Sequence, residues 1–283
     1  MKYRLRHRTT YAYAQPVDLA THLLHLLPRE TRHQRVLSAD ILCEPAPGSR
    51  SAAPDHFGNV ATWLFIERPH ARLDLVLNAL VEVGLPPPAP DATPWETLAA
   101  AAPWDAQEFL FDSAMAPATS EADAYAAPSF AHGRATFDAV RDLTTRVRRD
   151  FAFKPGATSI STPVAQVIAQ KAGVCQDFSH VMISALRARK IPARYVSGYI
   201  RTRPRPGEER RRGSDVSHAW ISAWCGPLAG WIDFDPTNDL VVADEHVTLG
   251  WGRDYADVSP VRGMLLGGGK HTVAVGVDLE PAD

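Results

Sequence analysis

A cluster of prolines divides the sequence into two parts of different character. Six prolines fall between residues 86 and 103: Pro86, Pro87, Pro88, Pro90, Pro94 and Pro103. Proline lacks a backbone N–H donor and fixes its own φ angle, so a regular helix or strand is not expected to run through such a stretch. We therefore predict a β-rich N-terminal domain over residues 1–85, a Pro-rich linker and irregular segment over 86–130, and a larger C-terminal domain over 131–283.

The region before the prolines has the pattern of an antiparallel β-structure. Tyr3, Leu5 and His7 alternate with arginines, which is the two-residue period of a half-buried strand. Residues 36–42, 61–66 and 73–83 are further strand candidates because they are rich in β-branched, aliphatic or aromatic side chains. Clusters of proline and glycine, such as residues 44–48, separate them. This pattern predicts a small β-sandwich.

The region after the linker mixes helices and strands. Residues 136–150 carry apolar side chains at spacings of three and four, which predicts a helix. Thr162-Pro163 opens a second short helix, and a third is expected from Cys175 to Lys190. Strands are expected at residues 193–200, 217–224 and 231–235, with a strand-like tail at 272–279. The predicted fold class is therefore α+β.

Composition narrows the possible functions. Apolar residues make up 45% of the chain and charged residues 22%, which are ordinary globular values, and a net charge of −2 gives no general attraction to nucleic acid or to membrane surfaces. The N-terminus has no apolar signal region, and no stretch approaches the roughly 18 apolar residues of a membrane helix. We expect a cytoplasmic protein.

The cysteine and histidine patterns bear on disulfides and metals. The chain has three cysteines, an odd number that argues against a disulfide framework in a chain of this size. It contains neither a CxxC nor an HExxH motif, so neither a metal site nor a cofactor is predicted. Cys43 and Cys225 have no base nearby in the sequence and are interpreted as structural.

Cys175 is the first candidate for chemistry. It follows Gly173 and Val174 and begins the predicted helix that ends near Lys190. At a helix N-terminus the backbone dipole stabilises a thiolate, which is the reactive form of cysteine. The alternative is a small buried hydrophobic residue, which is the commoner role of cysteine.

A thiolate nucleophile needs a base, and the base needs an orienting group. Residues 225–228 read as a four-residue turn that would pair Trp224 with Ala229, which places His218 opposite Asp235. Asp233 is the rival acid and would lie opposite Trp220. We prefer Asp235 because Pro236 ends the strand there, and a residue at a strand end is more easily exposed to substrate.

Three segments of the chain resemble bacterial transglutaminase-like proteins. Residues 173–180 (GVCQDFSH) look like the nucleophile segment of that family, 217–220 (SHAW) like its histidine motif, and 231–238 (WIDFDPTN) like its acid motif, in the same order. Residues 9–13, 27–29, 55–59 and 252–258 are similar to the flanking regions of the same proteins. The resemblance implies a papain-like core in which the cysteine helix packs on an antiparallel sheet.

The resemblance also implies an acyl-transfer mechanism. Cys175 would attack an amide bond of a peptide or protein, His218 would act as base and acid, and Asp235 would orient the histidine. The Cys175 backbone N–H is a candidate oxyanion donor, and Gln176, Trp220 and Asp233 are further candidates near the substrate; packing is the alternative role for Trp220. Hydrolysis is the favoured outcome. A transglutaminase that transfers the acyl group to an amine, or a non-catalytic partner-binding scaffold, is the alternative.

An arginine-rich segment lies between the cysteine and histidine motifs. Residues 201–212 contain six arginines and two glutamates. A charged run of this kind is usually a solvated loop. The sharper hypothesis is a lid or cationic wall that favours an acidic substrate. Neither this choice nor the oligomeric state follows from the sequence.

Overall fold

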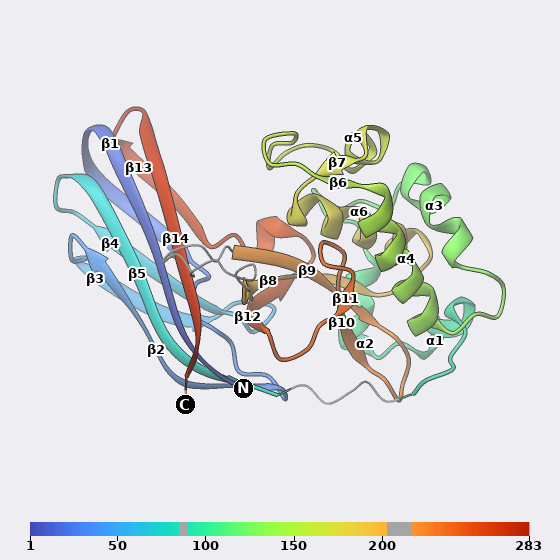
Figure 1. The fold of residues 1–283 in the computed structure, drawn as a ribbon. Helices are drawn as coiled ribbons and strands as arrows, with labels where there is room; N and C mark the ends of the chain where they lie inside the picture. The colour runs from blue at the N-terminus through green and yellow to red at the C-terminus, as the bar shows by residue number, and fades with distance from the viewer. Residues whose placement is uncertain (85–89, 203–216, 283) are drawn as a thin grey trace, which may run out of the picture.

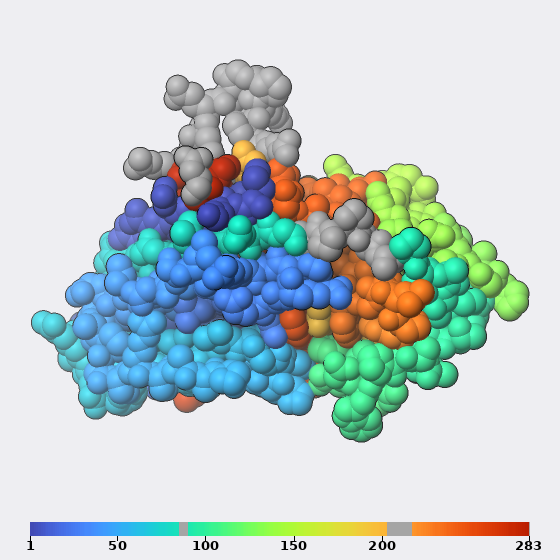
Figure 2. All heavy atoms as spheres, turned by 90° about the horizontal axis from the view of Figure 1, so that it is seen from below, coloured from blue at the N-terminus to red at the C-terminus, as the bar shows by residue number. Residues whose placement is uncertain are grey.

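The computed structural model describes residues 1–84, 90–202 and 217–282. These residues form an α+β structure with a curled antiparallel sheet on one side and a mixed layer of helices and strands on the other (Figure 1). Figure 2 shows the N-terminal segments, in blue, packed directly against the green and orange segments of the second layer. Most of the predicted arginine-rich segment lies outside the described residues.

The curled sheet has seven strands. Its main path runs in the order β2-β5-β1-β4-β3, and β13 and β14 pair with β1 off this path. The strands are β1 (Lys2–Leu24), β2 (Gln34–Glu44), β3 (Ser49–Pro54), β4 (Val60–Ile66), β5 (His70–Val83), β13 (Val261–Gly267) and β14 (His271–Ala282). The predicted strands at 36–42, 61–66, 73–83 and 272–279 all fall within these bounds.

The length of β1 makes the sheet curl. Residues 2–12 of β1 lie between β5 and β14, whereas residues 20–24 lie between β4 and β13. The register with β5 shifts between Ala12 and Val17, and such irregularities bend and twist a strand. Tyr3 and Leu5 are fully buried and Arg4 is exposed, as the alternation predicts. The β-rich region is thus one continuous curled sheet in place of two separate ones.

The two ends of the chain meet in this sheet. Residues Lys2–Tyr13 pair along their length with residues of β14, and the Met1 ammonium group donates to the Val83 carbonyl oxygen at 2.6 Å. The C-terminal strands, which we had grouped with residues 131–283, therefore hydrogen-bond to the N-terminal sheet (Figure 1). The domain boundaries near residues 85 and 130 stay a prediction.

The α-helices lie between β5 and the second sheet in the chain. The α-helices are α1 (Leu98–Ala101), α2 (Trp104–Gln107), α3 (Ser120–Ala126), α4 (Thr136–Asp150), α5 (Val164–Gln170) and α6 (Cys175–Ala188), and the 3-10 helices are Trp95–Thr97, Glu108–Leu110, Ala127–Ser129 and Tyr255–Asp257. The bounds of α4 match the prediction, and α6 begins at the predicted residue. The described part of the irregular segment holds only short helices.

The second sheet is antiparallel, with the order β11-β10-β9-β8-β12. Its strands are β8 (Ala193–Ile200), β9 (Ser217–Trp224), β10 (Trp231–Asp235), β11 (Leu240–Val241) and β12 (His246–Gly252); a separate parallel pair consists of β6 (Ala152–Phe153) and β7 (Ala172–Gly173). Helix α6 packs against β8 and β9. Met182, Ile183 and Leu186 of α6 are fully buried in this core.

Two buried amide side chains join the curled sheet to β12. The Gln34 side chain accepts from the Thr248 N–H at 2.8 Å and donates to the Thr248 carbonyl oxygen at 2.7 Å. Asn59 makes the same pair of bonds with the Trp251 backbone, at 2.9 and 2.8 Å. A side-chain amide carries one donor group and one acceptor, so it can pair with a backbone as a neighbouring strand would. Strand β12 is thereby held from both sides, by β8 and by the curled sheet.

Candidate active site

Helix α6 presents Cys175 at its first residue. The Val174 N–H, just before the helix, donates to Asp177 Oδ2 at 2.7 Å, and the Thr158 hydroxyl donates to the same oxygen at 2.7 Å. A Cβ atom at position 173 would lie 2.6 Å from that oxygen, so only glycine fits beside the Asp177 carboxylate. The Gly-Val-Cys-Gln-Asp run thus fixes the start of the helix and leaves Cys175 half-buried.

The Cys175 thiol lies near the His218 imidazole, and its interaction with the ring helps to raise the pKa of His218. The Nε2 atom of His218 lies 2.8 Å from Asp235 Oδ2, which leaves Nδ1 as the ring nitrogen for the thiol. His218 is 6% exposed and Asp235 is fully buried. The structure therefore brings the three predicted residues into one chain of thiol, imidazole and carboxylate.

The register that joins His218 to Asp235 differs from our prediction. Trp231, and not Ala229, lies opposite Trp224, and Phe234 lies opposite Ile221. One step further along this ladder, Asp235 comes opposite Trp220. The shift is two residues, so His218 and Asp235 stay on the same face and meet diagonally across the strands.

The turn itself explains the wrong register. Residues 225–230 form a loop longer than the predicted four residues, closed by a bond from the Cys225 N–H to the Gly230 carbonyl oxygen at 2.8 Å. The Asp91 carboxylate accepts the backbone N–H groups of Leu228 and Ala229 at 2.8 and 3.2 Å. Asp91 is remote in sequence, so no local turn rule could include it.

The Asp235 carboxylate is surrounded by donors. Oδ1 accepts the backbone N–H groups of Thr237 and Asn238 at 2.9 and 3.2 Å. Oδ2 accepts the Asn238 side-chain amide at 2.7 Å and lies 3.1 Å from His246 Nε2, in addition to His218. Sequence reasoning missed Asn238 and His246. Asn238 lies in the quoted acid segment, whereas His246 has no local signal because only the pairing of β12 with β8 brings it near.

These contacts set the charges of the histidine and the aspartate. Burial alone would lower the pKa of His218, but its bonds to Asp235 and Cys175 outweigh this and raise the pKa to about 9. Burial would raise the pKa of Asp235, yet the bonds from His218, His246 and Asn238 hold it well below its usual range. The arrangement favours a protonated imidazole beside an ionised carboxylate at neutral pH.

The same cluster is the candidate metal site among the described residues. One ligand atom each from His218, Asp235 and His246 can be chosen so that all lie within 4.8 Å of one another. Both imidazole Nε2 atoms are within hydrogen-bond distance of Asp235 Oδ2, however, so these atoms already satisfy one another. A metal ion would have to displace both bonds, and the donor set fits a hydrogen-bonded cluster better.

The other predicted substrate residues do not lie together in one site. The Gln176 side chain donates to the Ile160 carbonyl oxygen at 3.1 Å, near the thiol-bearing helix start. Trp220 is fully buried, and its only N–H donates to Asp233 Oδ2 at 2.9 Å. Trp220 and Asp233 are therefore bonded to each other and not to the thiol, and packing describes Trp220 better than contact with a substrate.

Tyr195 on β8 is a neighbour of the thiol that the sequence did not single out. Burial raises the pKa of its hydroxyl, and negative charge on Cys175 raises it further. The hydroxyl therefore stays protonated and remains a hydrogen-bond donor. His180, by contrast, is a buried core residue whose Nε2 accepts the Tyr255 backbone N–H at 3.2 Å.

A cysteine at a helix start, packed on an antiparallel sheet that carries a histidine and an aspartate, defines the transglutaminase-like class of folds. Residues 3–82 match the family model of the bacterial transglutaminase-like N-terminal region, and residues 123–236 match that of the transglutaminase-like superfamily. An uncharacterised protein of Mycobacterium tuberculosis is 38% identical over 99% of this chain and 93% of its own length. The chain belongs to the transglutaminase-like superfamily.

Two further comparisons bear on fold and chemistry. The crystal structure of a "Putative Cysteine Protease" from Cytophaga hutchinsonii is 21% identical, with a TM-score of 0.75 over 100% of this chain and 92% of that one. It shows the same fold. A protein-glutamine gamma-glutamyltransferase of Pseudomonas aeruginosa is 32% identical over 106 residues, which are 35% of this chain and 15% of that protein.

Proposed function

We propose that this protein is a cysteine-nucleophile acyl-transfer enzyme that hydrolyses amide bonds of peptides or proteins. The observation that carries the proposal is the 2.8 Å contact between His218 Nε2 and Asp235 Oδ2, together with the interaction of Cys175 with the same imidazole. A thiol, a base and an orienting carboxylate are the parts that nucleophilic catalysis needs, whatever the fold.

Each of these residues takes part in a step of the proposed hydrolysis. In the resting pair the Cys175 proton resides on His218, and the thiolate attacks the amide carbonyl carbon. The resulting oxyanion is bound by the Cys175 N–H at the helix start, with the Tyr195 hydroxyl as a second donor. His218 then gives its proton to the leaving amine, which departs and leaves a thioester. Water, deprotonated by His218, attacks the thioester and releases the acid and the thiol.

Transfer to an amine is the second candidate. The thioester is the same in both reactions, and the acceptor decides between them. The local similarity to a glutamyltransferase favours transfer. Hydrolysis requires no second binding site, whereas transfer requires a site that holds an amine and excludes water. We retain hydrolysis as the first candidate because none of the predicted substrate residues forms such a site.

A paired assay separates the candidates. The purified protein is incubated with an unfolded protein substrate, with and without a fluorescent primary amine, and new carboxyl termini and amine incorporation are both measured. If the protein hydrolyses peptide bonds, new carboxyl termini should appear without release of ammonia. If it transfers the acyl group, the fluorescent amine should be found on glutamine side chains. Cys175→Ser should abolish either activity, and Cys43→Ser should retain it. If neither activity is found, or if both survive Cys175→Ser, a non-catalytic scaffold becomes the better description.

Two further expectations accompany this proposal. In the described residues no helix is long and apolar enough to cross a membrane. The cytoplasmic location stays a prediction from the sequence, as does the expectation that the substrate is a peptide or protein and not a nucleic acid.

A further inference from the structure

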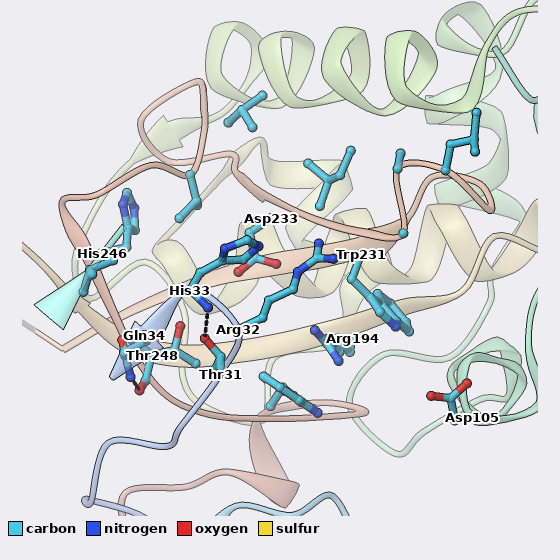
Figure 3. A pocket seen from close by; sticks show the side chains of 18 residues that line it. Thr31, Arg32, His33, Gln34, Asp105, Arg194, Trp231, Asp233, His246 and Thr248 are labelled. Atoms are coloured by element: carbon cyan, nitrogen blue, oxygen red, sulfur yellow. Dashed lines mark hydrogen bonds between the residues drawn. The ribbon is translucent and has the colours of Figure 1, made fainter. Parts of the chain in front are cut away.

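A cavity of about 640 Å³ lies between the Thr31–Gln34 segment and the second sheet (Figure 3). Trp231, Ile232 and Asp233 of β10 line it, while Phe234, the next residue, is buried in the core with α6. Cys175, His218 and Asp235, all described by the structure, do not line it. The cavity is therefore separate from the thiol, and its size suits a small organic molecule or a short peptide end.

Arg194 of β8 is the unusual group in this cavity. Its guanidinium carbon lies 4.2 Å from the ring centre of Trp231 and 3.7 Å from that of Trp251. Among the residues that the structure describes it makes no hydrogen bond or ion pair, and its Nε is buried without a partner. Aromatic rings that stack on the faces of a guanidinium group leave its N–H edge free. This edge can bind a carboxylate through two parallel hydrogen bonds.

The other charged groups of the cavity do not neutralise this edge. Arg32 extends from the N-terminal segment toward Asp233 and Trp231, and it adds a second cation (Figure 3). Asp233 already accepts the Trp220 N–H, and Asp105 lies away from it, near the helical segments. Desolvation lowers the pKa of Arg194 to about 9, and Asp233 and Asp105 oppose this only in part, so the half-buried cation is not fully compensated.

We propose that this cavity binds a carboxylate attached to an apolar body, with Arg194 and Arg32 holding the carboxylate. Val83, Val241 and Val242 supply apolar wall for the body of the ligand. Two sources share this chemistry, a free organic acid and the carboxyl terminus of a peptide. The site is independent of the proposed amide hydrolysis, because it requires neither the thiol nor His218.

The cavity also contacts His246, a residue that bonds to Asp235. His246 lines it, has a buried Nδ1 without a partner, and bonds through Nε2 to Asp235. Asp233 lines it and holds Trp220. A bound ligand would therefore touch His246, which bonds to the Asp235 carboxylate, and its effect would be measurable at Cys175.

The test uses the full-length Cys175→Ala protein, so that binding is measured without turnover. Calorimetric titrations compare 4-phenylbutyrate with 4-phenylbutyramide, and an acetylated tripeptide ending in Phe as free acid with the same peptide as amide. At least one acid should bind and both amides should not; which acid binds better assigns the source. Arg194→Gln should weaken binding by about tenfold or more, since a charge-assisted pair is lost.

Two variants keep the test decisive. Arg32→Gln changes an exposed side chain, so it should fold even if Arg194→Gln does not, and it should weaken the same acid. Arg148→Gln, an exposed arginine on α4, should leave the affinity unchanged. The proposal is overturned if neither acid binds, if acid and amide bind alike, or if Arg32→Gln binds the acid as tightly as Arg148→Gln does.

Discussion

The Nε2 atom of His246 lies 3.1 Å from Asp235 Oδ2, the same oxygen that lies 2.8 Å from His218 Nε2. One buried carboxylate thus holds two imidazoles, and only one of them reaches the thiol. His246 begins β12, which Gln34 ties to the curled sheet two residues later. The N-terminal sheet is therefore linked to the proposed triad through Gln34, β12 and His246.

His246 should act as a positioning residue. His246→Ala removes one donor from an ionised carboxylate, and a bond to a charged group contributes about 1.5–3 kcal/mol. We expect kcat to fall by about tenfold or more with little change in KM, because the substrate is not contacted. His246→Gln, which keeps an N–H donor, should recover part of the loss. The control is His22→Asn, a buried histidine of β1 with neither ring nitrogen bonded; an equal loss of kcat in that variant would show a general packing effect.

Gly173→Ala should reduce activity more than stability. The added Cβ would lie 2.6 Å from Asp177 Oδ2 and would push away the carboxylate that fixes the start of α6. We expect the thiol to be misplaced and kcat/KM to fall by about a hundredfold, since small displacements of reacting groups are costly. Gly84→Ala is the matched control because its added Cβ meets nothing within 4 Å. Equal activity of the two variants would contradict the assigned role of Gly173.

Stability should depend on pH through His218. Its pKa is raised from 6.5 to about 9, so the protonated ring stabilises the folded state. This contribution is fully present below about pH 6.5 and is lost as the pH rises through about 9; a shift of this size corresponds to about 3 kcal/mol. Urea unfolding should therefore show a larger loss of stability between these limits for the wild type than for His218→Gln. Parallel losses in the two proteins would argue against a protonated His218.

Asn59 should be important for docking the two sheets. Asn59→Ala leaves the Trp251 N–H and carbonyl without their partners, and also removes bonds to Arg29 and Asp55. Unsatisfied buried groups cost about 1–3 kcal/mol each, so the free energy of unfolding should fall by about 3 kcal/mol or more. Asn78→Ala, at an exposed position of β5, should change it by less than about 0.5 kcal/mol. Denaturant unfolding of both variants measures the difference.

Local pattern predicted most of the elements near the site. The bounds of α4, β8, β9 and β10 follow from apolar periodicity, and His218 and Asp235 are in contact although the predicted hairpin register was wrong by two residues. What the sequence could not supply were contacts made by distant residues. Asp91 sets the length of the β9–β10 loop and therefore the register, and β12 brings His246 to Asp235. The pairing of β14 with β1 likewise joins the two ends of the chain, and a local sequence pattern cannot predict a pairing between such distant segments.

Alkylation of the three cysteines by iodoacetamide near neutral pH tests the central claim most directly. Burial raises the pKa of Cys43 to about 11, and it raises the pKa of Cys225, which is also fully buried. Cys175 is half-buried and interacts with the His218 imidazole. We predict that peptide mass spectrometry will find Cys175 modified at least about a hundredfold faster than Cys43, and that His218→Ala will remove most of this advantage. Equal rates at Cys175 and Cys43, or a Cys175 rate unchanged by the loss of His218, would contradict the account.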